Sequence, residues 1–208
     1  MKVVVIAQKA APVLFQAVES VVIPDLSELV MHRDADLYID LDFAADPTRI
    51  AALTQLLPSP VIVNAVLPTI EEIGSPFIRI NGWPGMFERK VHELAVPDAA
   101  TAERVGRLYE KLGCLFKLAP DIPGMITARM LAVLINEAWY TWQEGVSGKE
   151  EIDTAMKLGT NYPMGPFEWG AHIGLNRVVG LLEVLSKTDS RYFPADSLKR
   201  AVAALKYD

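Results

Sequence analysis

The chain has 208 residues, 51 % of them hydrophobic, and a net charge of −6, which is typical of a globular protein of one or two small domains. It has no basic stripe for nucleic acid and no apolar run long enough to span a membrane. The single cysteine, Cys114, excludes an internal disulfide and a multi-cysteine metal site. The first residues lack the apolar core of a signal peptide, so we expect a cytoplasmic protein without nucleic-acid or membrane partners.

Glycine is absent from the first third of the chain, where the first glycine is Gly74. A phosphate-binding loop of the Rossmann or P-loop kind needs glycines, because its backbone adopts positive φ angles and approaches the phosphate closely. Residues 1–73 therefore cannot contain such a loop.

The first part of the chain alternates between short apolar strands and helices, which predicts a mostly parallel α/β layer. The segments that we expect to be strands are 2–7, 21–23, 36–43, 60–65, 78–80, 91–96 and 114–118. Residues 10–19 are mildly helical, and residues 25–31 form a helical turn or two. Further helices begin after the caps Asp46 and Asp98, and Gly113 ends the second of them.

The turn Asp121-Ile122-Pro123-Gly124 ends this alternation, and the pattern of every later segment predicts a helix. The expected helices cover 125–142, 148–158 with a capping box of Ser147 and Glu150, a segment opened by Pro166, another capped by Asn176, and about 195–206. The sequence thus predicts an α/β domain over 1–119 and an all-α domain over 120–208.

The part from Asp121 onward resembles the C-terminal helical domain of the 3-hydroxyacyl-CoA dehydrogenases. The most specific stretch is EEIDTAMKLGTNYPMGPFE, residues 150–168. The resemblance continues upstream to about residue 36, through the segments that carry the catalytic residues of that family. It implies a reduced Rossmann-like domain followed by a helical dimerisation domain, and therefore a homodimer. The family transfers hydride between NAD and the 3-hydroxyl group of an acyl-CoA.

The family's catalytic positions are mostly replaced in this chain. The histidine that acts as general base matches Asn81, and its glutamate partner is retained as Glu93. The catalytic serine matches Val66, although the asparagine two residues earlier is kept as Asn64. The asparagine of the first helix of the helical domain matches Ala128. Asparagine, valine and alanine cannot titrate near neutral pH, so the resemblance implies that proton transfer is lost.

The cofactor positions are changed as well. The residues after the first strand, 8–12, read QKAAP, and the segment up to residue 35 is too short for the family's second and third strands. Asp40, where the family has a glutamate near the cofactor, and Asn64 are the residues left at cofactor positions. Asp40 and Asp42 lie on one face of a strand; a metal or acid–base pair is one interpretation, and we favour a structural one. We expect neither NAD nor a metal ion to be bound.

Three further groups each allow two interpretations. Glu93 is either a surviving catalytic carboxylate or, as we favour, a structural strand residue. His92 could replace the lost base, but neighbouring strand residues point to opposite faces, so we expect it to face away from Glu93. Trp83 and Phe87 lie in a turn-rich loop and either cover or plug the cleft between the domains.

Three functional hypotheses follow. The first is a cytoplasmic, homodimeric 3-hydroxyacyl-CoA dehydrogenase-like protein of fatty acyl-CoA metabolism, without NAD binding or hydride transfer, with an acyl-CoA as the candidate ligand of the interdomain cleft. The second is an active NAD-dependent dehydrogenase with an altered site. The third is a non-catalytic structural partner that dimerises through its helical domain.

Overall fold

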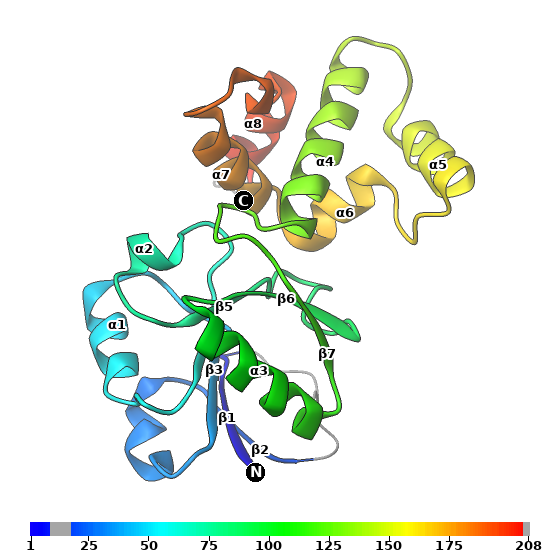
Figure 1. The fold of residues 1–208 in the computed structure, drawn as a ribbon. Helices are drawn as coiled ribbons and strands as arrows, with labels where there is room; N and C mark the ends of the chain where they lie inside the picture. Colours follow the sequence, from blue (N-terminus) through cyan, green and yellow to red (C-terminus); the bar gives the residue numbers. More distant parts are fainter. Residues whose placement is uncertain (9–17, 206–208) are drawn as a thin grey trace. The chain divides into compact units, whose positions relative to one another are not determined.

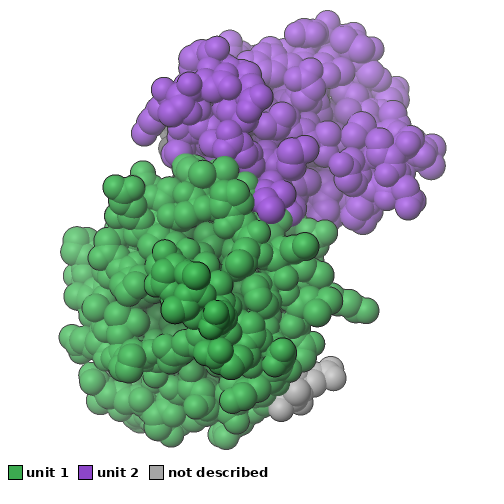
Figure 2. All heavy atoms as spheres, viewed as in Figure 1, with its two compact units in different colours: residues 1–125 green, residues 126–208 purple. Residues whose placement is uncertain are grey.

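The computed structural model describes residues 1–8 and 18–205, and these group into two compact units, 1–125 and 126–208 (Figure 2). The helical tendency expected over 10–19, most of the QKAAP segment and the end of the last predicted helix lie outside the described residues. The boundary between the two units, after residue 125, lies a few residues after the domain boundary expected from the sequence.

Among the described residues, unit 1 is built on a seven-stranded sheet with the order β2-β1-β3-β4-β5-β6-β7 (Figure 1). The pairing is parallel throughout except between β5 and β6, which run antiparallel. The strands are β1 (Lys2–Ile6), β2 (Glu19–Ile23), β3 (Leu37–Asp40), β4 (Val61–Asn64), β5 (Ile78–Ile80), β6 (Val91–Ala95) and β7 (Leu115–Leu118). The predicted, mostly parallel α/β layer is confirmed.

The order of the strands reverses at β1, which pairs with β2 on one side and with β3 on the other. In doubly wound sheets such a switch point, at the carboxyl ends of the strands, is where ligands bind. The dinucleotide-binding order has two strands beyond the first, whereas the described residues here place one strand, β2, in that half. The sheet is therefore a reduced Rossmann-like layer.

Helices cover both faces of this sheet, because alternate strand residues point to opposite sides. One apolar core lies between the sheet and α3 (Ala99–Leu112), and the other includes residues of η1 (Leu26–His32), α1 (Pro47–Thr54) and α2 (Ile70–Ile73). As predicted, Asp98 caps α3, accepting the Thr101 amide at 2.7 Å, and Gly113 ends it with a φ of 68°. The short helix α2 was not expected from the sequence.

His92 is buried on the α3 side of the sheet. Its Nε2 donates to the Phe87 carbonyl at 2.9 Å, so its Nδ1 accepts from the Tyr109 hydroxyl at 3.1 Å. The imidazole also stacks on Phe87, with 5.1 Å between the ring centroids. Burial lowers the pKa of His92, and the Phe87 and Arg89 carbonyls and the Glu88 carboxylate oppose this only in part. His92 is thus a neutral core residue.

Unit 2 is all-helical, as predicted, with helices α4 (Thr127–Gln143), α5 (Lys149–Thr160), α6 (Pro166–Ile173), α7 (Leu175–Ser186) and α8 (Asp196–Ala204) and the short η2 (Ser190–Tyr192). α4, α6 and α7 form its centre, where each packs on the other two. In the described part of the chain, no helix combines the length and apolarity needed to cross a bilayer.

Both ends of α5 and the start of α7 differ from the sequence prediction. The capping box of α5 lies one residue later than expected, because the Glu151 carboxylate accepts the Gly148 amide at 2.6 Å and also binds the Ser147 hydroxyl. α5 continues through Gly159 and ends before Asn161, which takes the left-handed conformation with a φ of 54°. α7 begins at Leu175 after Gly174, and Asn176 is its second residue.

The distinctive stretch 150–168 has a structural explanation. The buried Asp153 carboxylate caps α6 by accepting the amides of Phe167 at 2.8 Å and Glu168 at 3.2 Å. A Cβ atom on Gly165 would come within 2.3 Å of the Asp153 carboxyl group, so only glycine fits there. Pro166 opens the helix, where its missing N–H costs nothing. Asp153, Gly165 and Pro166 are therefore explained by the way in which α5 packs against α6.

The Lys149 ammonium lies among three aromatic rings of the same unit. It is 4.2 Å from the ring centroid of Trp139, 4.1 Å from that of Trp142 and 5.4 Å from that of Phe167. These cation–π contacts tie the start of α5 to α4 and α6. The aromatic group thus holds a side chain of its own unit.

Replacing Asp153 with alanine should destabilise unit 2 by about 1–2 kcal/mol, because two amides at the start of α6 lose their acceptor. Urea unfolding followed by tryptophan fluorescence measures this, since Trp139, Trp142 and Trp169 all lie in unit 2. The matched control is Thr154→Ala at the exposed neighbour, which should leave the unfolding midpoint nearly unchanged. Equal midpoints for the two variants would contradict the assigned cap.

Stability should fall as the solution is acidified below the ordinary pKa of histidine, about 6.5. The folded state keeps His92 neutral, so the unfolded state binds the proton first and is favoured as the pH drops. We expect the wild type to lose more free energy of unfolding than His92→Gln between about pH 7.5 and about pH 5.5. Parallel pH profiles of the two proteins would exclude His92 as the cause.

Candidate functional site

Residues that the resemblance matches to the family's cofactor and catalytic positions gather at the carboxyl ends of β3, β4 and β5 in unit 1. Asp40 is the last residue of β3, Asn64 is the last residue of β4, and Asn81 directly follows β5. The three strands are parallel neighbours, so their carboxyl ends meet at one edge of the sheet. We call this the carboxyl edge.

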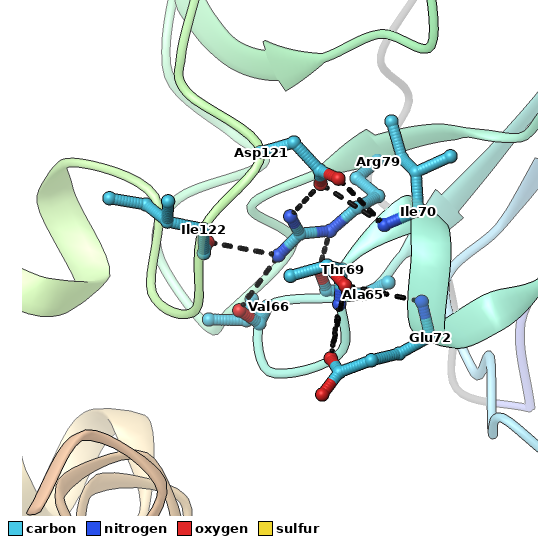
Figure 3. Close-up of polar contacts among 8 residues, drawn as sticks. All are labelled: Ala65, Val66, Thr69, Ile70, Glu72, Arg79, Asp121 and Ile122. Atoms are coloured by element: carbon cyan, nitrogen blue, oxygen red, sulfur yellow. Dashed lines mark hydrogen bonds and ion pairs between the residues drawn. The ribbon is translucent and has the colours of Figure 1, made fainter. Parts of the chain in front are cut away.

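A buried arginine holds the loops of the carboxyl edge together (Figure 3). The Arg79 guanidinium donates from Nε to the Ala65 carbonyl at 2.8 Å and from Nη2 to the carbonyls of Val66 at 3.1 Å and Ile122 at 3.3 Å. Its Nη1 forms an ion pair with Asp121. Burial lowers the pKa of Arg79, and the Asp121 carboxylate opposes this shift. Sequence reasoning missed this residue, whose signal is a charged side chain inside the apolar strand β5.

The Asp121 carboxylate extends this network to α2. Both of its oxygens accept the Ile70 amide, at 3.1 and 3.0 Å. Asp121 belongs to the segment that follows β7, so it connects that segment to the loop after β4. Arg79 and Asp121 therefore fix three stretches of backbone relative to one another.

Val66, at the serine position, contributes only its backbone to hydrogen bonding. Its carbonyl accepts from Arg79 and from the Gly124 amide, the latter at 2.8 Å, while its side chain is buried. Valine has no hydroxyl group, so this position cannot donate a proton or stabilise an oxyanion. Its role in the structure is to anchor the loop.

Asn64 is engaged with the neighbouring strands through both ends of its amide. Its Nδ2 donates to the carbonyls of Leu41 at 3.0 Å and Gly82 at 3.3 Å, and its Oδ1 accepts the Gly82 amide at 3.0 Å. A Cβ atom on Gly82 would lie 2.7 Å from the Asn64 Cγ, so the close approach requires glycine. Asn64 thus fixes the chain just after Asn81.

Asn81 and Glu93 are neighbours across the antiparallel pair β5–β6, since the Asn81 amide donates to the Glu93 carbonyl at 3.3 Å. Asn81 is 3 % exposed, and its Oδ1 accepts the Trp83 amide at 3.3 Å. Its Nδ2 has no hydrogen-bond partner among the residues that the structure describes. The structure therefore places together the two residues that match the family's histidine and glutamate, with an amide in place of the base.

The loop after Asn81 packs its large side chains inward. Trp83, Met86 and Phe87 are all buried. Phe87 supports His92 through both its ring and its carbonyl, so the loop is tied to the α3 side of unit 1. His92 is fully engaged there and is not placed to act at the carboxyl edge.

Asp40 and Asp42 have separate partners at the end of β3. The buried Asp40 carboxylate receives two hydrogen bonds of 2.6 Å from Arg49, which holds the first turn of α1 against the sheet. Burial raises the pKa of Asp40 and the Arg49 contacts oppose the rise, while the carboxylate raises the pKa of Arg49. A bidentate pair of this kind is a structural ion pair, in agreement with the interpretation favoured for Asp40.

The Asp42 carboxylate accepts the backbone amide of Gln8, which follows the first strand. This amide lies at the switch point of the sheet, where dinucleotide-binding folds present backbone amides to the pyrophosphate. A carboxylate there has the same sign of charge as a phosphate and already holds the amide. Among the described residues, the amide of Gln8 is therefore held by a carboxylate at the place where such a fold offers an amide to a pyrophosphate.

Ala128 belongs to unit 2, where it is buried in α4 and offers no polar group. Arg129 beside it donates to the Tyr192 hydroxyl, from Nε at 3.1 Å and from Nη2 at 2.7 Å. Desolvation raises the pKa of Tyr192, but the hydrogen bonds from Arg129 and Arg191 outweigh it and lower the pKa overall. Within residues 1–8 and 18–205, no cluster of three or more histidine, cysteine or acidic side chains could hold a metal ion.

Comparison with known proteins identifies the relatives of this chain. The family model described as 3-hydroxyacyl-CoA dehydrogenase, C-terminal domain, matches residues 124–208. The "Probable 3-hydroxybutyryl-CoA dehydrogenase" of Bacillus subtilis (strain 168) is 35 % identical over 177 residues, which cover 84 % of this chain and 61 % of that protein. The 3-hydroxyadipyl-CoA dehydrogenase of Escherichia coli (strain K12) is 42 % identical over 106 residues, 50 % of this chain and 22 % of that protein.

Solved structures agree with the sequence relatives. The crystal structure of (S)-3-hydroxybutyryl-CoA dehydrogenase from Ralstonia eutropha superposes with a TM-score of 0.73 at 27 % identity, over 89 % of this chain and 70 % of that one. The chain spans less than two thirds of the length of the curated relatives that it matches. Sequence and fold lead to one assignment: the chain belongs to the 3-hydroxyacyl-CoA dehydrogenase family.

Proposed function

We propose that this protein acts in fatty acyl-CoA metabolism. It binds an acyl-CoA thioester at the carboxyl edge and neither binds NAD nor transfers hydride. The observation that carries the proposal is the buried amide of Asn81 beside Glu93, at the position of the family's general base. The names of its relatives, which include 3-hydroxybutyryl-CoA and 3-hydroxyadipyl-CoA dehydrogenases, supply the class of ligand.

Proton transfer requires a group that can take up the proton of the 3-hydroxyl. A general base works best when its pKa lies near the working pH, and a carboxamide does not titrate in that range. The Asn81 Oδ1 is in addition occupied by the Trp83 amide. Val66 and Ala128 supply neither a hydroxyl nor an amide to stabilise charge on the substrate oxygen.

Cofactor binding is affected at separate residues. The Gln8 amide is held by the Asp42 carboxylate, and the Asp40 carboxylate is neutralised by Arg49. Together with the absence of glycine before Gly74, these contacts argue against a bound pyrophosphate. The two losses affect different steps of the family's reaction, which supports a protein that no longer carries it out.

We expect calorimetric titration to detect binding of acetoacetyl-CoA and no binding of NADH, and absorbance to detect no oxidation of NADH in the presence of both. The alternative of an active NAD-dependent enzyme requires NADH binding and turnover, and either result would overturn the proposal. Failure to bind either compound would favour a purely structural partner.

A restoration variant separates the two losses. The triple substitution Asn81→His, Val66→Ser, Ala128→Asn returns the family's catalytic residues while leaving the Gln8–Asp42 contact intact. We expect it to remain inactive with NADH, because the cofactor positions are unchanged. Appearance of dehydrogenase activity in this variant would show that NAD binding had been retained.

The proposal includes a homodimer formed through unit 2. Ile126, Met130 and Val133 follow one another at helical spacing at the start of α4, and all three are exposed, Met130 to 66 %. Further exposed apolar residues of the unit are Val146, Leu158, Tyr162, Phe193 and Leu205. An apolar stripe of this kind supports association with a second copy, as the family resemblance implies.

Met130→Glu should weaken the dimer by about tenfold or more, because a charge would be buried at the interface. Sedimentation velocity over a concentration series measures the dissociation constant. The matched control is Val30→Glu, an equally exposed apolar position of unit 1, which should leave the constant unchanged. A wild-type protein that sediments as a monomer at high concentration would exclude the dimer.

A further inference from the structure

We infer that the Asn81 amide is a hydrogen-bond donor that makes the carboxyl edge select a 3-keto acyl thioester over the 3-hydroxy form. The inference rests on the proposed function, since it concerns the ligand of the same site. It assigns Asn81 a role opposite to that of a general base: the residue gives a hydrogen bond to the ligand oxygen and takes up no proton.

The orientation of the amide is fixed by its neighbours. The Trp83 backbone N–H can only donate, so the Asn81 atom 3.3 Å from it is the carbonyl oxygen Oδ1. The Asn64–Gly82 hydrogen bonds, in both directions, hold the next residue of the chain in place. The NH₂ group of Asn81 must therefore point away from the Trp83 amide.

The NH₂ group is the part of this residue that lacks a partner. Its Nδ2 is buried and makes no hydrogen bond within the described residues. Asn81 as a whole is only 3 % exposed, so bulk water does not satisfy this donor. A buried donor without an acceptor is unfavourable, and native proteins rarely leave one. Since Asn81 lies at the carboxyl end of a parallel strand, where α/β sheets bind ligands, an oxygen atom of a ligand is the acceptor that we assign to it.

A carbonyl oxygen fits this donor better than a hydroxyl group. A keto oxygen only accepts hydrogen bonds, so the Asn81 N–H satisfies it. A hydroxyl group also brings a proton that needs an acceptor, while Asn81 Oδ1 is occupied by Trp83 and Val66 has no polar side-chain atom. The bound alcohol would leave its own O–H donor buried without an acceptor. The free-energy cost of that unpaired donor corresponds to a preference of about tenfold for the ketone.

Glu93 is the neighbour that could change this preference. It pairs with Asn81 across the two strands, so its carboxylate lies on the same face and could accept the proton of an alcohol. If it does so, the two ligands bind equally well. The comparison of the two ligands therefore tests the inference directly.

The experiment titrates the full chain with acetoacetyl-CoA, 3-hydroxybutyryl-CoA and butyryl-CoA, which lacks the 3-oxygen, in a calorimeter. We expect acetoacetyl-CoA to bind about tenfold more tightly than either of the others. Asn81→Asp is isosteric and keeps the acceptor for Trp83 but replaces the donor, so it should abolish the preference. The control Asn176→Asp makes the same chemical change at an exposed position and should retain it.

A second measurement uses the unmodified protein, in case Asn81→Asp does not fold. Hydrogen bonding to Nδ2 should shift one asparagine side-chain NH₂ pair in the ¹⁵N spectrum and lower the infrared stretching frequency of a ¹³C-labelled 3-keto group. Acetoacetyl-CoA that binds without moving either signal would overturn the inference, because a merely structural Asn81 predicts that outcome.

The outcomes also distinguish this inference from the proposed function. Equal binding of the keto and hydroxy thioesters, or tighter binding of the hydroxy form, overturns the role of Asn81 while leaving acyl-CoA binding in place. Absence of binding for all three thioesters overturns the proposed function and this inference with it. Tighter binding of the ketone that survives Asn81→Asp assigns the selectivity to another residue.

Discussion

The buried guanidinium of Arg79 is the contact on which the carboxyl edge depends. A charge removed from water is tolerated only when its hydrogen-bonding groups are satisfied, and here three backbone carbonyls and the Asp121 carboxylate satisfy it. These acceptors come from the loop after β4 and from the segment that follows β7. Loss of either partner would leave an unpaired charge inside unit 1, so the two segments can adopt only conformations that keep the pair.

This constraint holds the backbone of the carboxyl edge independently of the side chains at Val66 and Asn81. Val66, which the resemblance matches to the family's serine, has its carbonyl held by Arg79 and by the Gly124 amide. Asn64 and Gly82 are joined by hydrogen bonds in both directions. The backbone positions around Asn81 are thus set by residues other than the ones that would carry out catalysis, and a change of side chain at Asn81 or Val66 leaves the frame intact.

Much of the fold could be predicted from local patterns. Short β-branched runs identified the strands, and the caps Asp98 and Gly113 set the ends of α3, because these signals act within a few residues. The capping box of α5 was placed one residue early, since Ser147 and Gly148 are both good caps and Glu150 and Glu151 follow at the required spacing for each. The short helix α2 was missed because its four residues are too few to show the hydrophobic periodicity of a helix.

The candidate site was predictable in position and not in its hydrogen bonds. The resemblance matched Asn81 and Glu93 to the family's histidine and glutamate, and in the structure the Asn81 amide donates to the Glu93 carbonyl next to the antiparallel pair β5–β6. The Arg49 partner of Asp40 and the fixed orientation of the Asn81 amide depend on contacts between segments that local sequence does not specify. Arg79 was missed for the same reason, because its four acceptors come from residues at least thirteen positions away.

Part of the similarity to the family is explained by packing within unit 2. Within the stretch 150–168, Asp153 is explained by its cap of α6, and Gly165 by the room that it leaves for the Asp153 carboxyl group. Those contacts stabilise unit 2 whether or not a reaction takes place at the sheet. In the function that we propose, activity depends instead on whether a group at the carboxyl edge can accept a proton, and the Asn81 Nδ2 is a buried donor without a partner among the described residues. Similarity in the helical unit therefore reports how its helices pack. The chemistry that we propose depends on the Asn81 amide, which can donate a hydrogen bond and cannot take up a proton.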